Sequence, residues 1–240
     1  MLGCFAAMQI DGVVHLAAFQ AFSPEEGEIK DLVLSNIWLG TALLEACKKA
    51  DVKWFLNTGT IWQNYQSPDF LDVYNPVNLY AASKQAFLSM AKYYTETSSI
   101  RFCTLKLCDT YGPGDTRKKI LSLFDEARQT GCRLDLTPGK QQIDLLHIND
   151  VVSGFVRLTA ILADQEFPVC PEYVLSSGKR ISLRNLAVLY EKKYHTKLNI
   201  CWGAIPYRER TVMIPYKGNI LPGWSPIITE EDLYGDEIPS

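Results

Sequence analysis

The sequence predicts an α/β fold in which a doubly wound parallel sheet carries a smaller, mixed α/β lobe. From the start to about residue 164, short apolar runs alternate with amphipathic segments long enough to cross over between parallel strands. After residue 165 the apolar runs are shorter and the loops contain tryptophan, proline and tyrosine, which suits a small lobe over the carboxyl edge of the sheet. Hydrophobic residues make up 47% of the 240 residues, enough for a substantial core.

The first three elements are predicted to be a strand, a helix and a strand. Residues 11–18 form an apolar run that ends in small residues, which predicts a short buried strand. Residues 25–50 predict a long helix, because their apolar positions gather on one helical face. Residues 52–60 form a second apolar run, which predicts a buried strand that ends at a threonine.

A polar, proline-containing loop over residues 63–78 follows this strand. Residues 79–97 predict a helix with an apolar side that includes Phe87. Residues 100–108 predict the next strand, which the Tyr-Gly-Pro-Gly-Asp sequence at 111–115 breaks sharply.

The middle of the chain continues the alternation. Residues 118–130 predict a helix, residues 131–142 are rich in turn formers, and residues 143–148 predict a strand. Asn149 or Asp150 is expected to cap the helix that runs to about residue 163.

The last part of the chain predicts two strands and one helix. Residues 172–175 and 198–202 are the strands. Ser182 is expected to cap a helix that ends near His195.

Thr60, Tyr80 and Lys84 form the most informative constellation in the chain. Tyr80 and Lys84 lie one turn apart at the start of a predicted helix, after a strand that ends at Thr60. A lysine ammonium near a phenol lowers the pKa of that phenol, so Tyr80 would act as a general acid or base. Thr60 would hydrogen-bond the reacting oxygen. A Tyr-x-x-x-Lys spacing alone also suits ordinary helix packing, so the prediction depends on this context.

Composition excludes several classes of partner. The net charge of −3, with dispersed lysines and arginines, gives no electrostatic case for nucleic acid or an anionic membrane. The seven cysteines contain no C-x-x-C pair and several lie in apolar runs, as expected of reduced core residues in a cytoplasmic protein. The apolar runs are too short to span a membrane. No metal site is expected.

Six segments, in this order, carry a resemblance to a known family: residues 13–18, 36–46, 58–60, 80–84, 111–115 and 139–152. With them the chain resembles the extended short-chain dehydrogenases/reductases of the NAD-dependent epimerase/dehydratase type, which act on nucleotide sugars. The resemblance implies a Rossmann-like fold. Residues 1–164 would be an N-terminally truncated dinucleotide-binding domain, with 113–142 contributing partly to the substrate lobe, and residues 165–240 would be the substrate-binding lobe.

The resemblance implies a role for each matched position. Tyr80 would donate the proton to a 4-keto oxygen, Lys84 would bind the nicotinamide ribose, and Thr60 would hold the sugar oxygen. Asn36 would join the relay behind Lys84. Positions that would contact the NAD or NADP cofactor are Leu16, Ala17, Ala18, Thr58, Tyr80, Lys84, Leu107 and Cys108. Positions that would contact the nucleotide-sugar substrate are Thr60, Asp109 and Arg208, with Ser182 and Arg184 as weaker candidates.

Two of these residues, and one histidine outside the set, have simpler interpretations. Asn36 could serve only a hydrogen bond within its helix. Arg208 lies beside Glu209 and Arg210, so a solvated charge cluster is as reasonable as phosphate binding. His15 is expected to be a strand-end histidine rather than a catalyst.

Within the family, residues 136–152 and 176–183 look most like the CDP-4-dehydro-6-deoxyhexose 4-reductases, such as CDP-abequose and CDP-paratose synthases. Dehydratases of this group carry Asp-Glu directly after the threonine, where this chain has Ile61 and Trp62. Elimination of water would therefore lack its acid and base. A 4-epimerase needs only the same three groups, and it remains an alternative.

The chain also departs from the family pattern. No Gly-x-x-Gly-x-x-Gly or Gly-x-Gly-x-x-Gly turn occurs, although this turn normally holds the dinucleotide pyrophosphate. Gly3 and Gly12 are not followed by a helix start at the needed spacing. The resemblance implies that about the first 55 to 60 residues of a complete member have no counterpart here. Ile143 stands where many relatives carry a diphosphate-binding arginine, and Asp109 stands where many carry asparagine.

The sequence therefore predicts an NAD(P)-dependent reductase of an NDP-4-keto-6-deoxyhexose, of the kind used in deoxysugar and lipopolysaccharide biosynthesis. Tyr80 would be its proton donor. A homodimer is expected by analogy with relatives that pair through the helices carrying Tyr80 and Asn36. The alternatives are a 4-epimerase and a non-catalytic homologue that acts as a binding or assembly subunit.

Overall fold

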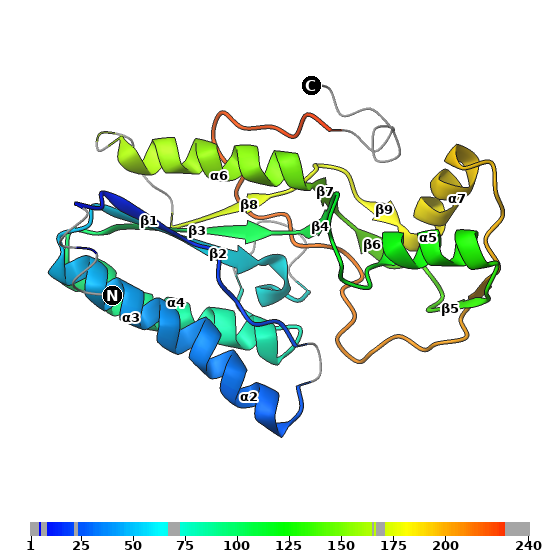
Figure 1. Cartoon of the computed structure of the whole chain (residues 1–240), viewed down its shortest axis with the longest axis horizontal. Coiled ribbons are helices and arrows are strands. Elements are labelled where there is room, and N and C mark those ends of the chain that lie inside the picture. The colour runs from blue at the N-terminus through cyan, green and yellow to red at the C-terminus, as the bar shows by residue number, and fades with distance from the viewer. Residues whose placement is uncertain are drawn as a thin grey trace.

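The computed structural model describes residue 5 and residues 9–21, 24–66, 73–164, 166 and 171–228. Helices and strands alternate along most of this length (Figure 1). In chain order the elements are β1 (Gly12–His15), α2 (Glu26–Val33), the π-helical η1 (Leu34–Trp38), α3 (Leu39–Lys49), β2 (Trp54–Thr60), the 3₁₀ turn η2 (Ile61–Gln63), α4 (Leu79–Thr97), β3 (Arg101–Leu107), β4 (Asp109–Tyr111), α5 (Ile120–Thr130), β5 (Leu134–Leu136), β6 (Gln142–Ile143), β7 (Leu145–His147), α6 (Ile148–Ala163), β8 (Glu172–Leu175), β9 (Ile181–Ser182), α7 (Leu183–Lys193) and β10 (Ile200–Trp202).

The main sheet has four parallel strands in the order β1-β2-β3-β8. Helices α2, α3 and α4 cover one face and α6 covers the other (Figure 1). The predicted α/β fold with a parallel sheet is therefore confirmed. Strands β2 and β3 end in register, with Thr60 opposite Leu107, so their carboxyl ends share one edge of the sheet. Ligands of open parallel sheets bind outside this edge.

Beyond the carboxyl edge lies a smaller group of elements, which contains α5, α7 and short strands (Figure 1). Here β5 pairs in parallel with β10, and β6 pairs antiparallel with β9. A separate core packs around Phe124, Leu186 and Tyr190. Strand β4 pairs with β7 between this group and the main sheet. The division into residues 1–164 and 165–240 stays a prediction, and β8 from the second segment completes the main sheet.

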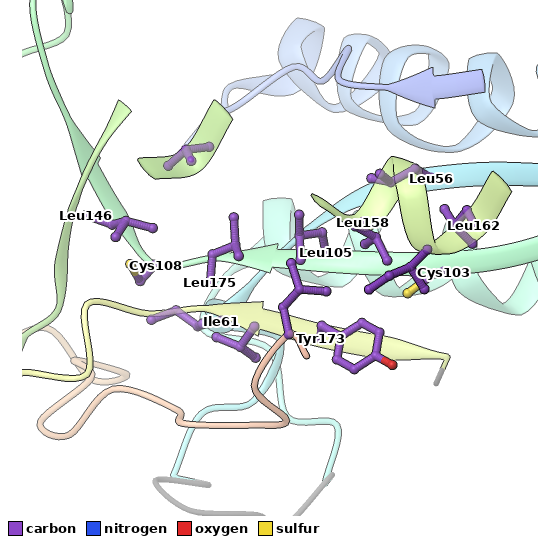
Figure 2. Packing of buried hydrophobic residues seen from close by; sticks show 14 of the residues in the cluster. Leu56, Ile61, Cys103, Leu105, Cys108, Leu146, Leu158, Leu162, Tyr173 and Leu175 are labelled. Carbon is purple, nitrogen blue, oxygen red and sulfur yellow. The ribbon is translucent and has the colours of Figure 1, made fainter. Parts of the chain in front are cut away.

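Two hydrophobic clusters sandwich the main sheet. The cluster under α6 includes Leu105, Leu158 and Leu175, all fully buried (Figure 2). Burial of each such side chain contributes about 1.5–3 kcal/mol. On the opposite face, Phe87 of α4 packs so closely on α3 that a Cβ at Gly40 would come within 2.6 Å of its ring. The close approach of these helices fixes the start of α4 relative to the sheet edge.

Local signals set several helix ends as predicted. Asn78 caps α4, because its side chain accepts a hydrogen bond from the Ala81 backbone N–H at 3.0 Å. Ser182 caps α7 through the Asn185 N–H at 3.2 Å. Gly131 ends α5 in a left-handed conformation, with φ of 69°.

Three local predictions are wrong. His147, rather than Asn149 or Asp150, caps α6: its Nδ1 accepts from the Asn149 N–H at 3.2 Å, because the helix already begins at Ile148. The predicted strand at 143–148 is split at Asp144, because Ile143 pairs with β9 whereas Leu145–His147 pair with β4. The predicted strand at 11–18 pairs only over Gly12–His15, and Val14 is 39% exposed because β1 is an edge strand.

Candidate active site

A cleft of about 1410 Å³ opens where the strands of the main sheet end. The end of β2, the start of α4, β4 and the loop before α5 all contribute to its walls. Predicted site residues that line it are Thr58, Thr60, Tyr80, Leu107, Cys108, Asp109 and Arg208. Elements far apart in sequence thus bring the predicted strand-end and helix-start groups to one cavity.

Thr60 presents a hydroxyl that is ready to donate a hydrogen bond. It is the last residue of β2 and is 9% exposed. Its Oγ1 accepts from the Trp62 N–H at 3.3 Å, and its own N–H donates to Gln63 Oε1 at 3.0 Å. This reciprocal cap fixes the side chain at the sheet edge. The hydroxyl proton has no acceptor among the described residues and remains available to a ligand.

Tyr80 and Lys84 lie on the first turns of α4. Tyr80 is half-buried and lines the cleft, whereas Lys84 is 3% exposed and lies behind it. Within the described segments, neither the phenol nor the ammonium has a hydrogen-bond partner. Burial lowers the pKa of Lys84 to about 8, so the ammonium remains mostly protonated at pH 7.

The electrostatics of Tyr80 differ from the prediction. Burial raises the pKa of this phenol, and the charge that opposes the rise is the guanidinium of Arg117, not the ammonium of Lys84. Arg117 lies in the loop before α5 and lines the same cleft. Its guanidinium is held by Asp115, with Nε–Oδ1 at 2.7 Å and Nη2–Oδ2 at 2.8 Å. No local signal in the sequence predicts that this loop lies near Tyr80.

Asn36 braces the site from behind. It is 1% exposed and sits in the π-helical turn η1, a local widening that is frequent at functional sites. Its side chain binds both backbone groups of Phe19, each at 2.8 Å, and donates to Ser83 Oγ at 2.9 Å. Ser83 in turn donates to the Tyr80 carbonyl at 2.8 Å. Asn36 therefore joins the loop after β1 to the helix that carries Tyr80 and Lys84.

Comparison with known proteins identifies the family. The model of the NAD-dependent epimerase/dehydratase family matches residues 2–167. This chain belongs to that family. A CDP-abequose synthase of Salmonella muenchen is 26% identical over 211 residues, covering 88% of this chain and 69% of the relative. A probable UDP-glucuronate 4-epimerase of Rhizobium meliloti is 24% identical over 245 residues, covering 92% of this chain and 71% of the relative.

Solved structures share the fold of the family. The UDP-glucose 4-epimerase of Thermotoga maritima, solved with UDP-glucose, matches with a TM-score of 0.82 and 18% identity over 96% of this chain and 77% of the other. The dTDP-glucose 4,6-dehydratase of Streptomyces venezuelae, solved with NAD, matches with a TM-score of 0.78 and 19% identity over 97% of this chain and 74% of the other. At these identities the likeness shows the fold, a Rossmann-like α/β arrangement.

The family uses NAD or NADP, and part of this site suits that cofactor. Lys84 offers a buried ammonium one helical turn after Tyr80, and the cleft is also lined by Leu107, which ends β3, and by Cys108, which follows it. Leu16, Ala17 and Ala18, in contrast, are exposed and do not line the cleft in the described part of the chain. Asn36 nevertheless holds Phe19 and so fixes the course of this loop. The nicotinamide and its ribose therefore fit the residues present.

The described residues supply no glycine-rich turn for the pyrophosphate of the cofactor. Gly12 lies within β1, where an added Cβ would come within 1.9 Å of the Trp54 ring, so it serves packing. Gly3 lies outside the described residues. Thr58 uses its hydroxyl to bind the His15 carbonyl at 2.9 Å, a bond that ties β2 to β1.

Cys108 and Asp109 are neighbours at the cleft, where Cys108 is buried and Asp109 is half-buried. Burial raises the pKa of the Cys108 thiol well above its usual range, which keeps it neutral. Burial also raises the pKa of Asp109 to about 6; Lys119 opposes this rise and Asp144 adds to it. The Asp109 carboxyl lines the cleft and has no hydrogen-bond partner among the described residues. It is therefore free to contact a ligand.

The arginines form a second group in the cleft. Arg208 is exposed and lines it, as does Arg210, which the sequence analysis treated only as a neighbour. Arg210 donates to Asn75 Oδ1 and lies 4.7 Å from the Tyr65 ring centre. Its Nε is buried and has no partner in the described segments. The available signal was only that Arg210 lies close to Arg208 in the sequence, because both belong to one turn, in which the Thr211 N–H bonds the Arg208 carbonyl at 3.1 Å.

Two further buried residues near Lys84 are His15 and Ser83. His15 is 3% exposed against the rings of Phe55 and Phe87, and burial together with the Lys84 ammonium lowers its pKa to about 4. It is therefore neutral at pH 7. Ser83 was missed, although its place directly before Lys84 was the signal.

In the described segments no group of His, Cys, Asp and Glu could hold a metal ion, and no helix has the length and apolar character to cross a membrane.

Proposed function

We propose that the chain is an NAD(P)H-dependent reductase of the 4-keto group of an NDP-4-keto-6-deoxyhexose, with Tyr80 as proton donor. The observation that carries this proposal is the convergence of Thr60 and Tyr80 on one cleft, with Lys84 buried one helical turn behind. When bound, NAD(P)H supplies the hydride. Hydride addition at C4 leaves negative charge on the keto oxygen, and the Tyr80 phenol donates the proton that neutralises it.

Each neighbouring group has a defined task. The Thr60 hydroxyl donates to the sugar oxygen, because a keto oxygen can only accept, and the hydrogen bond from the Trp62 N–H holds the hydroxyl in place. Lys84 holds the nicotinamide ribose with its buried ammonium. Arg117 stabilises the phenolate that remains after proton transfer. Asn36, through Ser83, fixes the first turn of α4 so that these groups keep their positions.

Reduction is favoured over dehydration by the residues after Thr60. Ile61 and Trp62 line the cleft where an acid and a base would be needed to remove water from the sugar. The similarity to CDP-abequose synthases supports the same choice. Arg208 and Arg210 would hold the substrate diphosphate, because guanidinium groups bind phosphate oxygens in pairs.

A homodimer is part of this proposal. Helices α2, η1 and α4 expose several large apolar side chains, which would be covered by a second copy: Ile29, Val33, Leu34, Trp38, Met90 and Tyr93. Light scattering coupled to gel filtration would measure the mass in solution.

Substitution of Tyr80 by phenylalanine tests the mechanism. Tyr80→Phe should lower kcat by about 10²–10⁴-fold, because the change removes only the acidic O–H. The assay follows NADPH oxidation in the presence of CDP-4-keto-6-deoxyglucose. Tyr74→Phe is the matched control, since Tyr74 is 46% exposed and does not line the cleft. Full activity in Tyr80→Phe would remove the phenol from the mechanism.

Two other functions remain testable alternatives. The exposed position of Leu16–Ala18 favours a non-catalytic subunit, and a fluorescence titration with NADH distinguishes it: saturable micromolar binding favours an enzyme, whereas no binding at millimolar cofactor favours the subunit. A 4-epimerase would need the same three groups. Interconversion of UDP-glucose and UDP-galactose, followed with catalytic rather than stoichiometric NAD, would favour that activity over reduction.

A further inference from the structure

Three polar side chains on α6 hold the last described segment of the chain, residues 221–228, which we call the C-terminal strap. Asp150 accepts hydrogen bonds from the backbone N–H groups of Ile227 and Ile228, both at 3.0 Å. Ser153 accepts from the Trp224 indole N–H at 2.9 Å. Arg157 donates to the Pro222 carbonyl at 3.0 Å. The red end of the described chain passes along α6 in Figure 1.

The spacing of these contacts gives the strap a direction. Asp150, Ser153 and Arg157 are three and four residues apart and so share one helical face. Later positions on α6 hold earlier positions on the strap, so the two run antiparallel. The strap therefore returns toward the first turn of α6, where Ile227 and Ile228 line the cleft.

Asp150 clamps the tip of the strap, residues 227 and 228, through two hydrogen bonds from its backbone. The carboxylate is on a residue that is 2% exposed, and each of its oxygens accepts one N–H, an arrangement that makes strong charge-assisted bonds. At the other end of the strap, Leu221 is 1% exposed and belongs to the core under α6. Ile227, in contrast, is 79% exposed. The clamp thus fixes backbone whose large apolar side chain gains almost no burial within the described part of the chain.

We propose that Ile227 forms an apolar wall for the nucleotide sugar and that Asp150 is the positioning residue that holds this wall in place. The inference rests on the proposed function for the identity of the ligand. An exposed isoleucine at a cleft gains burial only when a ligand covers it, and the carbon face of a hexose is such a surface. Asp150 acts through the strap and touches no reacting atom.

Ile227→Ala is the first test, because a residue so exposed can be changed without loss of fold. It should raise the KM for the nucleotide sugar about fivefold while kcat changes less than twofold, since the apolar contact is made equally in ground and transition states. Ile220→Ala is the matched control: Ile220 is 59% exposed, directly precedes the strap and does not line the cleft. Equal KM values for the two variants would overturn the proposal.

Asp150→Asn tests the clamp itself. The amide keeps one acceptor oxygen but turns an N–H₂ toward the other backbone N–H, so the tip should loosen. Amide hydrogen exchange at Ile227 and Ile228 should become at least about tenfold faster, and the KM should rise as in Ile227→Ala. Ser153→Ala, which removes one bond farther from the tip, should change both quantities less. Unchanged exchange in a folded Asp150→Asn protein would overturn the positioning role.

Binding measurements separate this inference from the proposed reaction. Calorimetric titration with CDP-glucose and UDP-glucose, each in the presence of NAD, requires no turnover. Weaker binding to Ile227→Ala than to Ile220→Ala would support the apolar wall even in a chain that reduces nothing. Equal binding, or no binding of either sugar nucleotide at millimolar concentration, would overturn it whatever the outcome for Tyr80→Phe.

Discussion

The cleft wall that carries Thr60 and Tyr80 is held by buried hydrogen bonds, whereas the wall formed by residues 112–119 is held by ion pairs at the surface. On the first wall, Asn36 and Ser83 are 1% and 6% exposed. On the second, Asp115 binds Arg117 and also Lys119, at 3.1 Å, and the Arg117 side chain is 56% exposed. Buried bonds are costly to break, and exposed pairs contribute little to stability.

The two walls of the cleft therefore have different tasks. The first wall sets the geometry of the reacting groups, and it does so with interactions on which the fold itself depends. The second wall sets the local charge, because its guanidinium and ammonium groups reach into the cleft without being part of a core. Substitutions in the first wall should therefore change stability, and substitutions in the second should change the pH dependence with little effect on the fold.

The largest expected effect comes from Asn36→Ala. The change removes three buried hydrogen bonds and leaves the Phe19 N–H and carbonyl without their partner. At about 1 kcal/mol for each bond, the free energy of unfolding should fall by about 3 kcal/mol. Urea denaturation measures it. Thr41→Val, which removes one side-chain bond to the Ile37 carbonyl nearby, is the control and should cost less than about 1 kcal/mol. Equal losses of unfolding free energy in the two variants would mean that Asn36 stabilises the fold no more than a single side-chain hydrogen bond within a helix does.

Asp109 lies between the two walls, and its effect on stability depends on pH. Burial raises its pKa from 3.8 to about 6. Below the lower value both folded and unfolded chains are protonated there, and Asp109 costs nothing. Between the two values the unfolded chain loses this proton first, so stability falls as the pH rises and stays lowered above about pH 6.

Asp109→Asn should remove this cost. The variant should be more stable than the parent by up to about 3 kcal/mol at pH 8, and the gain should vanish near pH 4. Thermal unfolding across this pH range measures it. Asp31→Asn on α2, where the side chain is exposed, is the control and should stay within about 0.5 kcal/mol of the parent at every pH. A pH-independent gain in Asp109→Asn would show that the carboxyl is not the titrating group.

The same contrast explains how far the sequence could predict the molecule. Helix α4 was predicted to the residue, because a polar, proline-containing loop precedes it and a long apolar face follows. Strands β2 and β3 were predicted to within two residues, because continuous apolar runs mark buried parallel strands. Since α4 connects the parallel strands β2 and β3, it must begin at the edge where β2 ends. The convergence of Thr60 and Tyr80 on one cleft therefore follows from topology, and the family resemblance only adds to it.

What the sequence could not predict depends on contacts without a local signal. The π-helical turn η1 directs the Asn36 side chain toward Phe19 and Ser83. It falls within residues 25–50, where the apolar pattern predicts an ordinary α-helix. Asp150 was read as a helix cap, yet it holds backbone 77 residues away. The reach of Arg117 toward Tyr80 depends on the path of a glycine- and proline-containing loop, which composition does not specify.

The smallest effect is expected at Arg117. Its guanidinium opposes the effect of burial on Tyr80, so Arg117→Gln should raise the pKa of that phenol further. The rise should be less than about 1 pH unit, because water and salt screen a side chain that is more than half exposed. A carbon-13 NMR titration of proteins labelled at tyrosine Cζ would measure it, with Tyr80→Phe to assign the signal.

Lys118→Gln is the matched control for that titration. Lys118 is the next residue along the loop, is exposed and also lines the cleft, and burial of Tyr80 is unaffected by either change. Because Asp115 aims Arg117 and not Lys118, only Arg117→Gln should move the Tyr80 titration. Equal shifts in the two variants would mean that the loop acts by its total charge, and the specific role of the Asp115–Arg117 pair would have to be abandoned.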